Sequence, residues 1–544
     1  MSSTRREFLK TGVLLGSLGT TSVNAEVKQK ARVDAICSPT GTKKFKLDTS
    51  VKRVRKSFYD LTDEELKTLC KAIGYMRNDM PTDSSLHWEN YGRQHAHHCT
   101  ESGEGNPQVH WSWYFLPWHR GYIYFLERIL ANILTTKLSI DGTKFAYPYW
   151  DWMTHKEIPN TRLRAQVGLA SPLFGYDLTQ EDMVNADNLG FDNTALYDGN
   201  RGPTILKPTM DPNNELTVDS QNHVKETLYY TSPEYIGQIL ATPFEQFGGK
   251  STIDRNTGQG LLEQGPHNDG HDWVGTRIGK NRSMGTLRYA ALDPIFYMHH
   301  GNIDRIFSMY KNPMPDLNGP WGKQTYQYTD IDGSWVTVSV KDIMTGITDS
   351  ISYGESNSTG LLKSTAPKKI TRTVKTTVNK EITNKPVEVN VSLLDNVADI
   401  LKSQTALLDV TMGAITYTGK YQIDIYIKDA NGEQVNVGRI RMLDGEHRKD
   451  TSSNATHKFS VLLKQIKSPP IGNIELTSTK LAYSHSMIKR KISVDEVNIE
   501  ELQQLKEKYM LSTKNLLKYD MLNELKNISR SHLSQLIMVN QREV

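Results

Sequence analysis

Histidine is unevenly spread along this chain. Ten of the sixteen histidines fall in two windows, one holding His87, His95, His97, His98, His110 and His119, and the other His267, His271, His299 and His300. Neutral imidazole is the commonest metal ligand in proteins. Sites rich in imidazole and without paired carboxylates suit zinc, copper, iron or nickel. Three ligands from each window would hold two equivalent metal ions, and helices of a bundle commonly hold such a pair between them.

The second window has the more informative spacing. His267 and His271 are four residues apart, so on a helix both project from one face. His300 lies on a later helical segment and can complete a three-histidine site. Zinc hydrolases use the same spacing with a glutamate between the two histidines. Here the intervening residues are Asn268, Asp269 and Gly270. The general base of those enzymes is therefore missing, although a zinc hydrolase stays open as an alternative.

Length and composition set broad limits. A chain of 544 residues is too long for one compact domain, so two or three are expected. The net charge is only +4, and no basic run dominates the first 350 residues, so no nucleic-acid partner is expected. The three cysteines, Cys37, Cys70 and Cys99, are too few for a disulfide scaffold.

The first 25 residues have the pattern of an export signal. Arg5 and Arg6 precede a short apolar run, which ends near the small residues Val23-Asn24-Ala25. The paired arginines followed by Phe8 and Leu9 resemble a twin-arginine signal. The apolar run is too short to span a bilayer. We therefore expect a periplasmic or secreted protein, exported by the twin-arginine route, with no membrane span.

Hydrophobic periodicity predicts helices over 51–80, 119–134 and 293–310. The first has a start signal, with Thr62 as cap and Glu65 three residues later. Residues 160–230 are rich in Asn, Asp, Gly and Pro, which predicts long loops. Alternation predicts strands at 326–328, 335–340 and 421–427. Residues 356–390 show little periodicity and are interpreted as a linker or an extended strand-like arm.

Two segments resemble the copper motifs of tyrosinases and plant polyphenol oxidases. Gln108–Trp113 and Pro117–Arg128 are similar to the first motif, and Asp293–Arg305 is similar to the second. The aromatic segment Tyr147–Trp152 between them also fits. The resemblance spans about residues 50–310, with weaker similarity to about 355.

The resemblance implies an architecture. It is a mainly α catalytic domain with a helical-bundle copper site, followed by a β-rich C-terminal domain and a helical tail. The expected divisions are a signal peptide at 1–25, the copper domain at 26–355, a linker at 356–389, a β-rich capping domain at 390–478 and a helical tail at 479–544. In the family the C-terminal domain packs over the copper pocket and keeps the enzyme latent, so an intramolecular cap is expected here.

The resemblance also implies the ligands of two copper ions per chain. The first ion would be bound by His95, His110 and His119, and the second by His267, His271 and His300. His97 and His98 compete with His95 for the first position. His299 would be a neighbour of the ligand His300 and not a ligand itself.

Four further residues take implied roles. Cys99 would form a thioether bond to His110. Glu263 and Asn268 would hold and polarise a water that takes the phenolic proton, because a phenol has a pKa near 10. Leu287, thirteen residues before His300, occupies the family's gate position. It is smaller than an aromatic side chain, which leaves room for a phenol ring.

The implied activity is oxidation of small phenols with O₂ as co-substrate. Monophenols would be hydroxylated at the ortho position, and o-diphenols would be oxidised to o-quinones. One alternative is a catechol oxidase or aminophenol oxidase that lacks the hydroxylation step. Another is a haemocyanin-like oxygen carrier, against which the export signal and the small gate residue argue.

Overall fold

The structure is a computed structural model. It describes residues 42–47, 50–100, 109–154, 195–196, 198, 229–251, 258–274 and 284–355, and, in the C-terminal part, 373–378, 388–391, 406–412, 421–428, 431, 433–443, 457–464 and 474–480. The expected signal peptide at 1–25, most of the expected loops at 160–230 and the tail beyond 480 lie outside these residues. Within the described segments, no helix combines the length and the apolar character needed to cross a bilayer.

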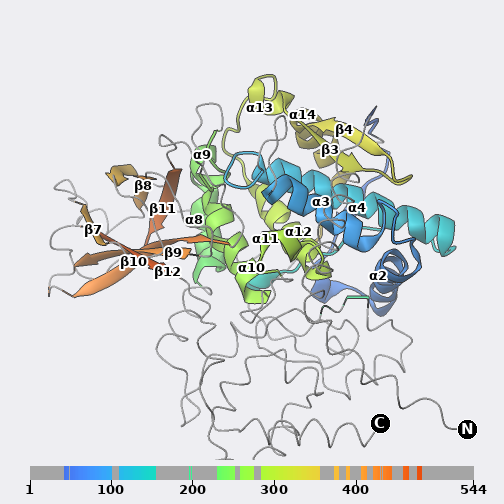
Figure 1. The fold of residues 1–544 in the computed structure, drawn as a ribbon, viewed down its shortest axis with the longest axis horizontal. Helices are drawn as coiled ribbons and strands as arrows, with labels where there is room; N and C mark the ends of the chain where they lie inside the picture. The colour runs from blue at the N-terminus through green and yellow to red at the C-terminus, as the bar shows by residue number, and fades with distance from the viewer. Residues whose placement is uncertain are drawn as a thin grey trace, which may run out of the picture.

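Helices form the centre of the molecule (Figure 1). The longest is α4, which is apolar on nearly every side and is therefore buried on most of its surface. α12 begins with Asp293, whose side chain accepts a hydrogen bond from Ile295 N–H, and with Pro294 in its first turn. The central helices are α3 (Trp88–Thr100), α4 (Phe115–Lys137), η5 (Glu263–His267), α10 (Asn268–Val274), α11 (Leu287–Ala290) and α12 (Pro294–Met309).

The helix predicted over 51–80 is partly correct. Thr62 and Glu65 form the expected capping box at the start of α2 (Asp63–Gly74), and a π-helical turn, η2 (Tyr75–Asp79), follows. Residues Arg53–Arg55 instead form strand β2, which pairs in parallel with β5 (Ile351–Tyr353). The partner strand lies almost 300 residues later, so local periodicity could not reveal it.

Smaller elements surround this centre. β3 (Thr325–Thr329) and β4 (Trp335–Ser339) pair antiparallel, as the alternation predicted, and β1 (Lys43–Lys44) adds to β4. The remaining short helices are η1 (Phe58–Asp60), η3 (Trp152–Thr154), α8 (Pro233–Leu240), α9 (Phe244–Phe247), α13 (Pro320–Lys323), α14 (Val340–Asp342), η6 (Ile343–Ile347) and α15 (Thr348–Ser350).

A buried group of charged side chains ties three of these elements together. Arg55 of β2 binds both carboxylate oxygens of Glu127 in α4, each at 2.8 Å, and Asp304 of α12, also at 2.8 Å. Arg120 of α4 binds the other oxygen of Asp304 at 2.6 Å. The four side chains are almost completely buried. They therefore fix α4 and α12, which carry predicted metal ligands, against each other.

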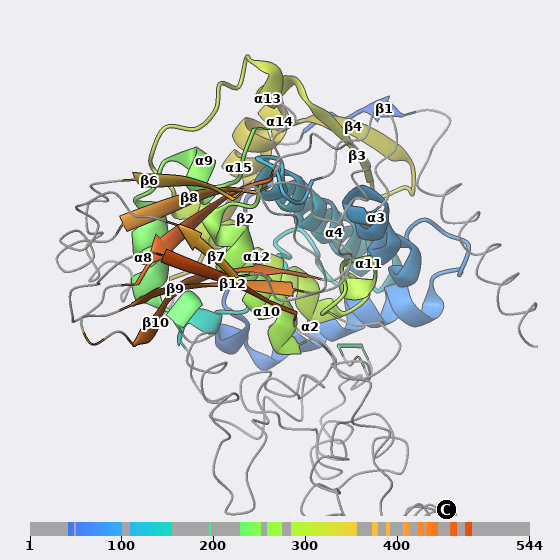
Figure 2. The ribbon, with the colours of Figure 1, turned by 60° about the vertical axis from the view of Figure 1, so that its left-hand side comes forward.

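The C-terminal part is built from two sheets. One has the order β10-β9-β12-β7 and the other β11-β8-β6. Figures 1 and 2 show these strands beside α8 and α10. The strands are β6 (Thr373–Val378), β7 (Glu388–Val391), β8 (Ala406–Met412), β9 (Tyr421–Lys428), β10 (Gln434–Met442), β11 (His457–Leu463) and β12 (Ile474–Lys480).

The linker expected over 356–389 is corrected by two of these strands. β6 pairs in parallel with β8, and β7, which begins at Glu388, pairs antiparallel with β12. The β region therefore begins before residue 390, as in the alternative of an extended strand-like arm. Parallel pairing with a distant strand leaves no local turn signal, so the sequence pattern missed it.

Candidate metal centre

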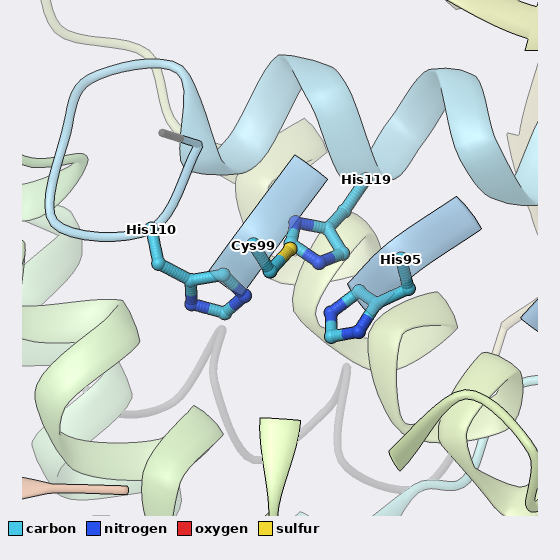
Figure 3. A group of neighbouring side chains, drawn as sticks. All are labelled: His95, Cys99, His110 and His119. Carbon is cyan, nitrogen blue, oxygen red and sulfur yellow. The ribbon is translucent and has the colours of Figure 1, made fainter. Parts of the chain in front are cut away.

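The six predicted ligands come from five helices and one turn. His95 lies on α3, His110 in the turn before α4, and His119 on α4. His267 ends η5, His271 lies on α10 and His300 on α12. Each is at most 2% exposed. Figure 3 shows the first three imidazoles converging from their separate elements.

Five of these histidines have the same hydrogen-bond pattern at Nδ1, which donates to a nearby oxygen. The acceptors are the carbonyl oxygens of Leu287 (to His95, 3.0 Å), Phe115 (to His119, 2.8 Å) and Met284 (to His271, 2.7 Å), the Glu263 carboxylate (to His110, 3.0 Å) and the Asn268 side-chain oxygen (to His267, 2.8 Å). A proton on Nδ1 leaves the lone pair on Nε2. Metal-binding histidines usually have this second hydrogen bond, which fixes tautomer and ring orientation.

Several of the buried Nε2 atoms lack a hydrogen-bond partner in the part of the chain that the structure describes. Among the described residues, no hydrogen-bond partner lies at Nε2 of His95, His119 or His267, although all three are buried. Buried polar atoms normally have a partner, so such atoms need an explanation. A metal ion bound by these nitrogens would provide one. The residues present therefore fit a metal site.

Burial also keeps these side chains neutral. Removal from water lowers the pKa of His119 to about 3, and burial lowers the pKa of His95, His110, His267 and His300 well below the usual range. Neighbouring imidazoles lower the pKa values further. At neutral pH no proton has to leave these nitrogens before a metal ion binds.

The two histidine windows meet in one place. The rings of His119 and His300 are stacked with centroids 4.0 Å apart. The rings of His110 and His267 are 5.4 Å apart, and those of His119 and His267 6.4 Å apart. Two three-histidine groups at this separation can hold a pair of metal ions next to each other.

His299 and His300 compete for the third place in the second group. By distance alone, His267, His271 and His299 place ligand atoms within 4.8 Å of one another. However, His299 Nε2 donates to the carbonyl oxygen of His267, and its Nδ1 accepts from Trp152. Both ring nitrogens are therefore occupied, and we do not take His299 as a ligand.

His300 fits the role better. Its Nε2 lies 3.3 Å from Nε2 of His271. Two imidazole nitrogens that share one tetrahedral ion at about 2.0 Å are about 3.3 Å apart. Nδ1 of His300 has no hydrogen bond within the part of the chain that the structure describes, so its tautomer is not set as in the other five histidines.

Cys99 lies inside the first group. One ligand atom each of His95, Cys99, His110 and His119 all lie within 4.8 Å of one another, and the thiol is completely buried. Figure 3 shows the sulfur between the rings of His110 and His119. The competitors of His95 are placed differently. His98 packs its ring on Trp118 at 5.2 Å, and neither His97 nor His98 joins this group.

Glu263 and Asn268 contact ligands directly. Glu263 accepts from His110 Nδ1 and from the backbone N–H of Trp111, both at 3.0 Å, and is 1% exposed. Asn268 accepts from His267 and donates to the carbonyl oxygen of Arg441 in β10 at 2.7 Å. Both side chains hold ligand imidazoles in place, a role that the sequence reading did not assign to them.

Leu287 is completely buried at the start of α11. Its backbone contacts a predicted ligand, because the Leu287 carbonyl oxygen accepts the Nδ1 hydrogen bond of His95. Sequence reasoning could not find this contact or the matching one from Met284 to His271, since any residue type provides a carbonyl oxygen. Gly270 was likewise not singled out. A Cβ there would lie 2.2 Å from His299, so only glycine allows this approach.

Comparison with known proteins shows what this chain is similar to. Residues 85–313, which contain all six predicted ligands, match the common central domain of tyrosinase. The chain is also similar to plant polyphenol oxidases. It is 29% identical over 341 residues to the latent polyphenol oxidase of Prunus armeniaca, covering 59% of this chain and 52% of the relative. It is 31% identical over 324 residues to the polyphenol oxidase of Vitis vinifera, covering 56% and 48%.

The chain spans about half the length of these curated relatives. Solved structures extend the likeness in fold. A latent aurone synthase (polyphenol oxidase) superposes with a TM-score of 0.56 at 20% identity, covering 82% of this chain and 90% of the other. Latent apple tyrosinase gives 0.53 at 17% identity, covering 81% and 96%. The predicted fold class, a helical metal-binding core followed by a β-rich C-terminal region, is confirmed.

Proposed function

We propose that this chain is a copper-dependent phenol oxidase. One copper ion would be bound by His95, His110 and His119, and a second by His267, His271 and His300. The observation that carries the proposal is the shared tautomer, in which Nδ1 is fixed by an oxygen and Nε2 is left for a metal, at five of these positions. The match of residues 85–313 to the common central domain of tyrosinase supports copper as that metal.

The copper pair would supply the reaction with O₂. The chain's own residues would hold the imidazoles, exclude bulk water and bind the phenol. Aromatic rings pack against the histidines. The ring centroid of Phe296 lies 4.7 Å from that of His95 and 4.3 Å from that of His300, and the centroids of Phe115 and His267 are 4.6 Å apart. A phenol ring would find an apolar surface there, and such surfaces favour aromatic stacking.

The finer proposal is ortho-hydroxylation of monophenols followed by oxidation of o-diphenols to o-quinones. A monophenol has to lose its proton near the metals, and the Glu263 carboxylate lies next to a predicted ligand, 3.0 Å from His110 Nδ1. Glu263 and Asn268 would hold a water that accepts this proton. Leu287 would leave space for the ring.

One experiment tests both levels. The purified chain would be loaded with copper and assayed side by side with tyrosine, a simple catechol and an o-aminophenol, with metal content measured on the same sample. We expect about two copper ions per chain and turnover of the catechol and of tyrosine. Turnover of the catechol or aminophenol alone would reduce the proposal to a catechol or aminophenol oxidase. Reversible oxygen binding without turnover would indicate a carrier, and zinc in place of copper would refute the proposal.

Three further parts of the proposal concern processing. The C-terminal β region would cover the copper site and keep the enzyme latent, as suggested by the structures of latent relatives. The thiol of Cys99 would be joined to a ring carbon of His110 by a thioether bond, with loss of the S–H and one ring C–H hydrogen and with O₂, the co-substrate of the proposed reaction, taking up the two electrons. Residues 1–25 would direct export through the twin-arginine route. Replacement of Arg5 and Arg6 by lysine should retain the protein inside a bacterial host, as fractionation would show.

A further inference from the structure

The second histidine pair encloses a buried carboxylate. Asp269 lies between His267 and His271 and is completely buried. Its two oxygens are bound by two arginines of β10. Arg441 Nη1 lies 2.7 Å from one of them, and Arg439 Nη2 binds the other. A buried carboxylate is strongly unfavourable unless it is paired in this way.

Arg441 holds the same turn at a second point. Its carbonyl oxygen accepts a hydrogen bond from Asn268 Nδ2 at 2.7 Å, and the Asn268 side-chain oxygen accepts the Nδ1 hydrogen of His267 at 2.8 Å. A continuous chain of hydrogen bonds therefore runs from β10 to a predicted ligand. The guanidinium of Arg441 also lies 3.4 Å from Asp272, one residue after His271.

Arg439 is itself held firmly in place. Its guanidinium lies 4.4 Å from the ring centroid of Tyr230, and its backbone N–H donates to the hydroxyl of that tyrosine at 3.0 Å. Both arginine side chains are at most 2% exposed. Water therefore could not replace them as partners of Asp269 in the assembled protein.

Contacts of the neighbouring strand β11 fix how the C-terminal sheets lie on the helical part. Trp111, next to His110, packs edge-on against Phe459 of β11 with centroids 5.5 Å apart. Lys250 donates to the hydroxyl of Ser460 at 3.1 Å. A Cβ on Gly258 would lie 1.8 Å from the carbonyl oxygen of Lys458, so the two backbones touch. The sheets are thus docked in one defined position.

We propose that Arg439 and Arg441 are positioning residues of the second metal site, so that the C-terminal β region is a part of the metal-binding unit as well as a cover. The inference rests on the proposed function. Without the two guanidinium groups, Asp269 is a buried charge that has lost both of these cations, and the turn that carries His267 and His271 has to move to hydrate it. Loss of the arginines should therefore weaken the second copper site and leave the first unchanged.

The test uses the full-length chain and a competition titration of copper against a chelator. Arg441→Met should lower the affinity of the second copper by about 10- to 100-fold, as loss of a residue that orients ligands does elsewhere. The first copper should bind as in the unchanged protein. Arg441→Lys, which keeps the charge, should recover part of the loss. Lys464→Met is the matched control, because Lys464 is a cation of the same interface that packs on the Tyr229 ring, with Nζ 5.1 Å from the ring centroid.

A double variant makes the test specific. If Arg441 acts through Asp269, combining Arg441→Met with Asp269→Asn should lower the affinity by clearly less than the two single losses added together. Should Arg441→Met fail to fold, Arg439→Met leaves Arg441 on the carboxylate and should show a smaller loss at the second site alone. Two coppers bound with unchanged affinity in the arginine variants would overturn the inference. An unchanged chain that binds no copper would overturn the proposed function instead.

Discussion

Replacing Arg55 with methionine should strongly destabilise the helical core. Arg55 pairs with both Glu127 of α4 and Asp304 of α12, and its side chain is completely buried. Burial alone would lower the pKa of Arg55, but Glu127, Tyr353 and Asp304 together raise it well above the usual range, as expected for a tightly paired guanidinium.

The size of the effect depends on which hydrogen-bond partners each carboxylate keeps after Arg55 is replaced. Asp304 keeps Arg120 at 2.6 Å and the Tyr353 hydroxyl at 2.6 Å. Glu127 keeps only the backbone N–H of Tyr147 at 2.9 Å among its described contacts. Glu127 is therefore left without a hydrogen-bonded cation, although Arg53 still interacts with it electrostatically. Breaking a buried pair in this way costs about 3–5 kcal/mol. With roughly 2–4 °C per kcal/mol for a domain of this size, the melting temperature should fall by roughly 6–20 °C.

Thermal and urea unfolding of the metal-free protein would measure this loss. Arg93→Met provides the control, because Arg93 pairs with a half-exposed Glu89 one helical turn away at 3.5 Å. That pair should contribute less than about 1 kcal/mol. A double variant, Arg55→Met with Glu127→Gln, should recover part of the stability. If Arg55→Met lost no more than Arg93→Met, the charged group would not be what holds α4 against α12.

Three further outcomes are expected. His300→Gln should lose the second copper in metal analysis, whereas His299→Gln should keep it and lose about 1–3 kcal/mol of stability through its hydrogen bonds to His267 and Trp152; loss of copper from His299→Gln alone would reverse our choice of ligand. If Cys99 and His110 are joined, mass spectrometry of the linked peptides should show two hydrogen atoms fewer than the free peptides, and Cys99→Ala should abolish the linked species. Burial lowers the pKa of His119 to about 3, so below pH 6.5 the unfolded chain takes up a proton that the folded metal-free protein does not. The free energy of unfolding should therefore fall as the pH falls from 6.5 towards 3, by up to about 1.4 kcal/mol per pH unit from this residue. Equal urea midpoints at pH 7.5 and 5.5 would contradict this.

The sequence was most informative where the structure of a segment depends on residues within that segment. The capping box of Thr62 and Glu65, the apolar surface of α4 and the Asp293-Pro294 start of α12 are all local signals, and the corresponding helices are present. The spacing of His267 and His271 belongs to the same class. The structure also brings together six histidines from widely separated positions, as the family resemblance implied.

The remaining features depend on contacts between distant residues. Strand β2 lies within a segment predicted to be helical, because its partner β5 follows almost 300 residues later. The oxygens that hold the imidazoles of His95 and His271 belong to the backbone of residues 287 and 284, where no side-chain pattern marks them. The sequence assigns no role to Asp269, since its arginine partners lie on a strand about 170 residues away.

That separation has a consequence for biosynthesis. Arg441 follows Asp269 by 172 residues, so a ribosome must finish most of the C-terminal sheet before the Asp269 carboxylate can be neutralised. Until then the helical half can gather His95, His110 and His119, but the turn bearing His267 and His271 lacks its cationic support. The proposed second copper site would therefore be complete only after synthesis has passed β10.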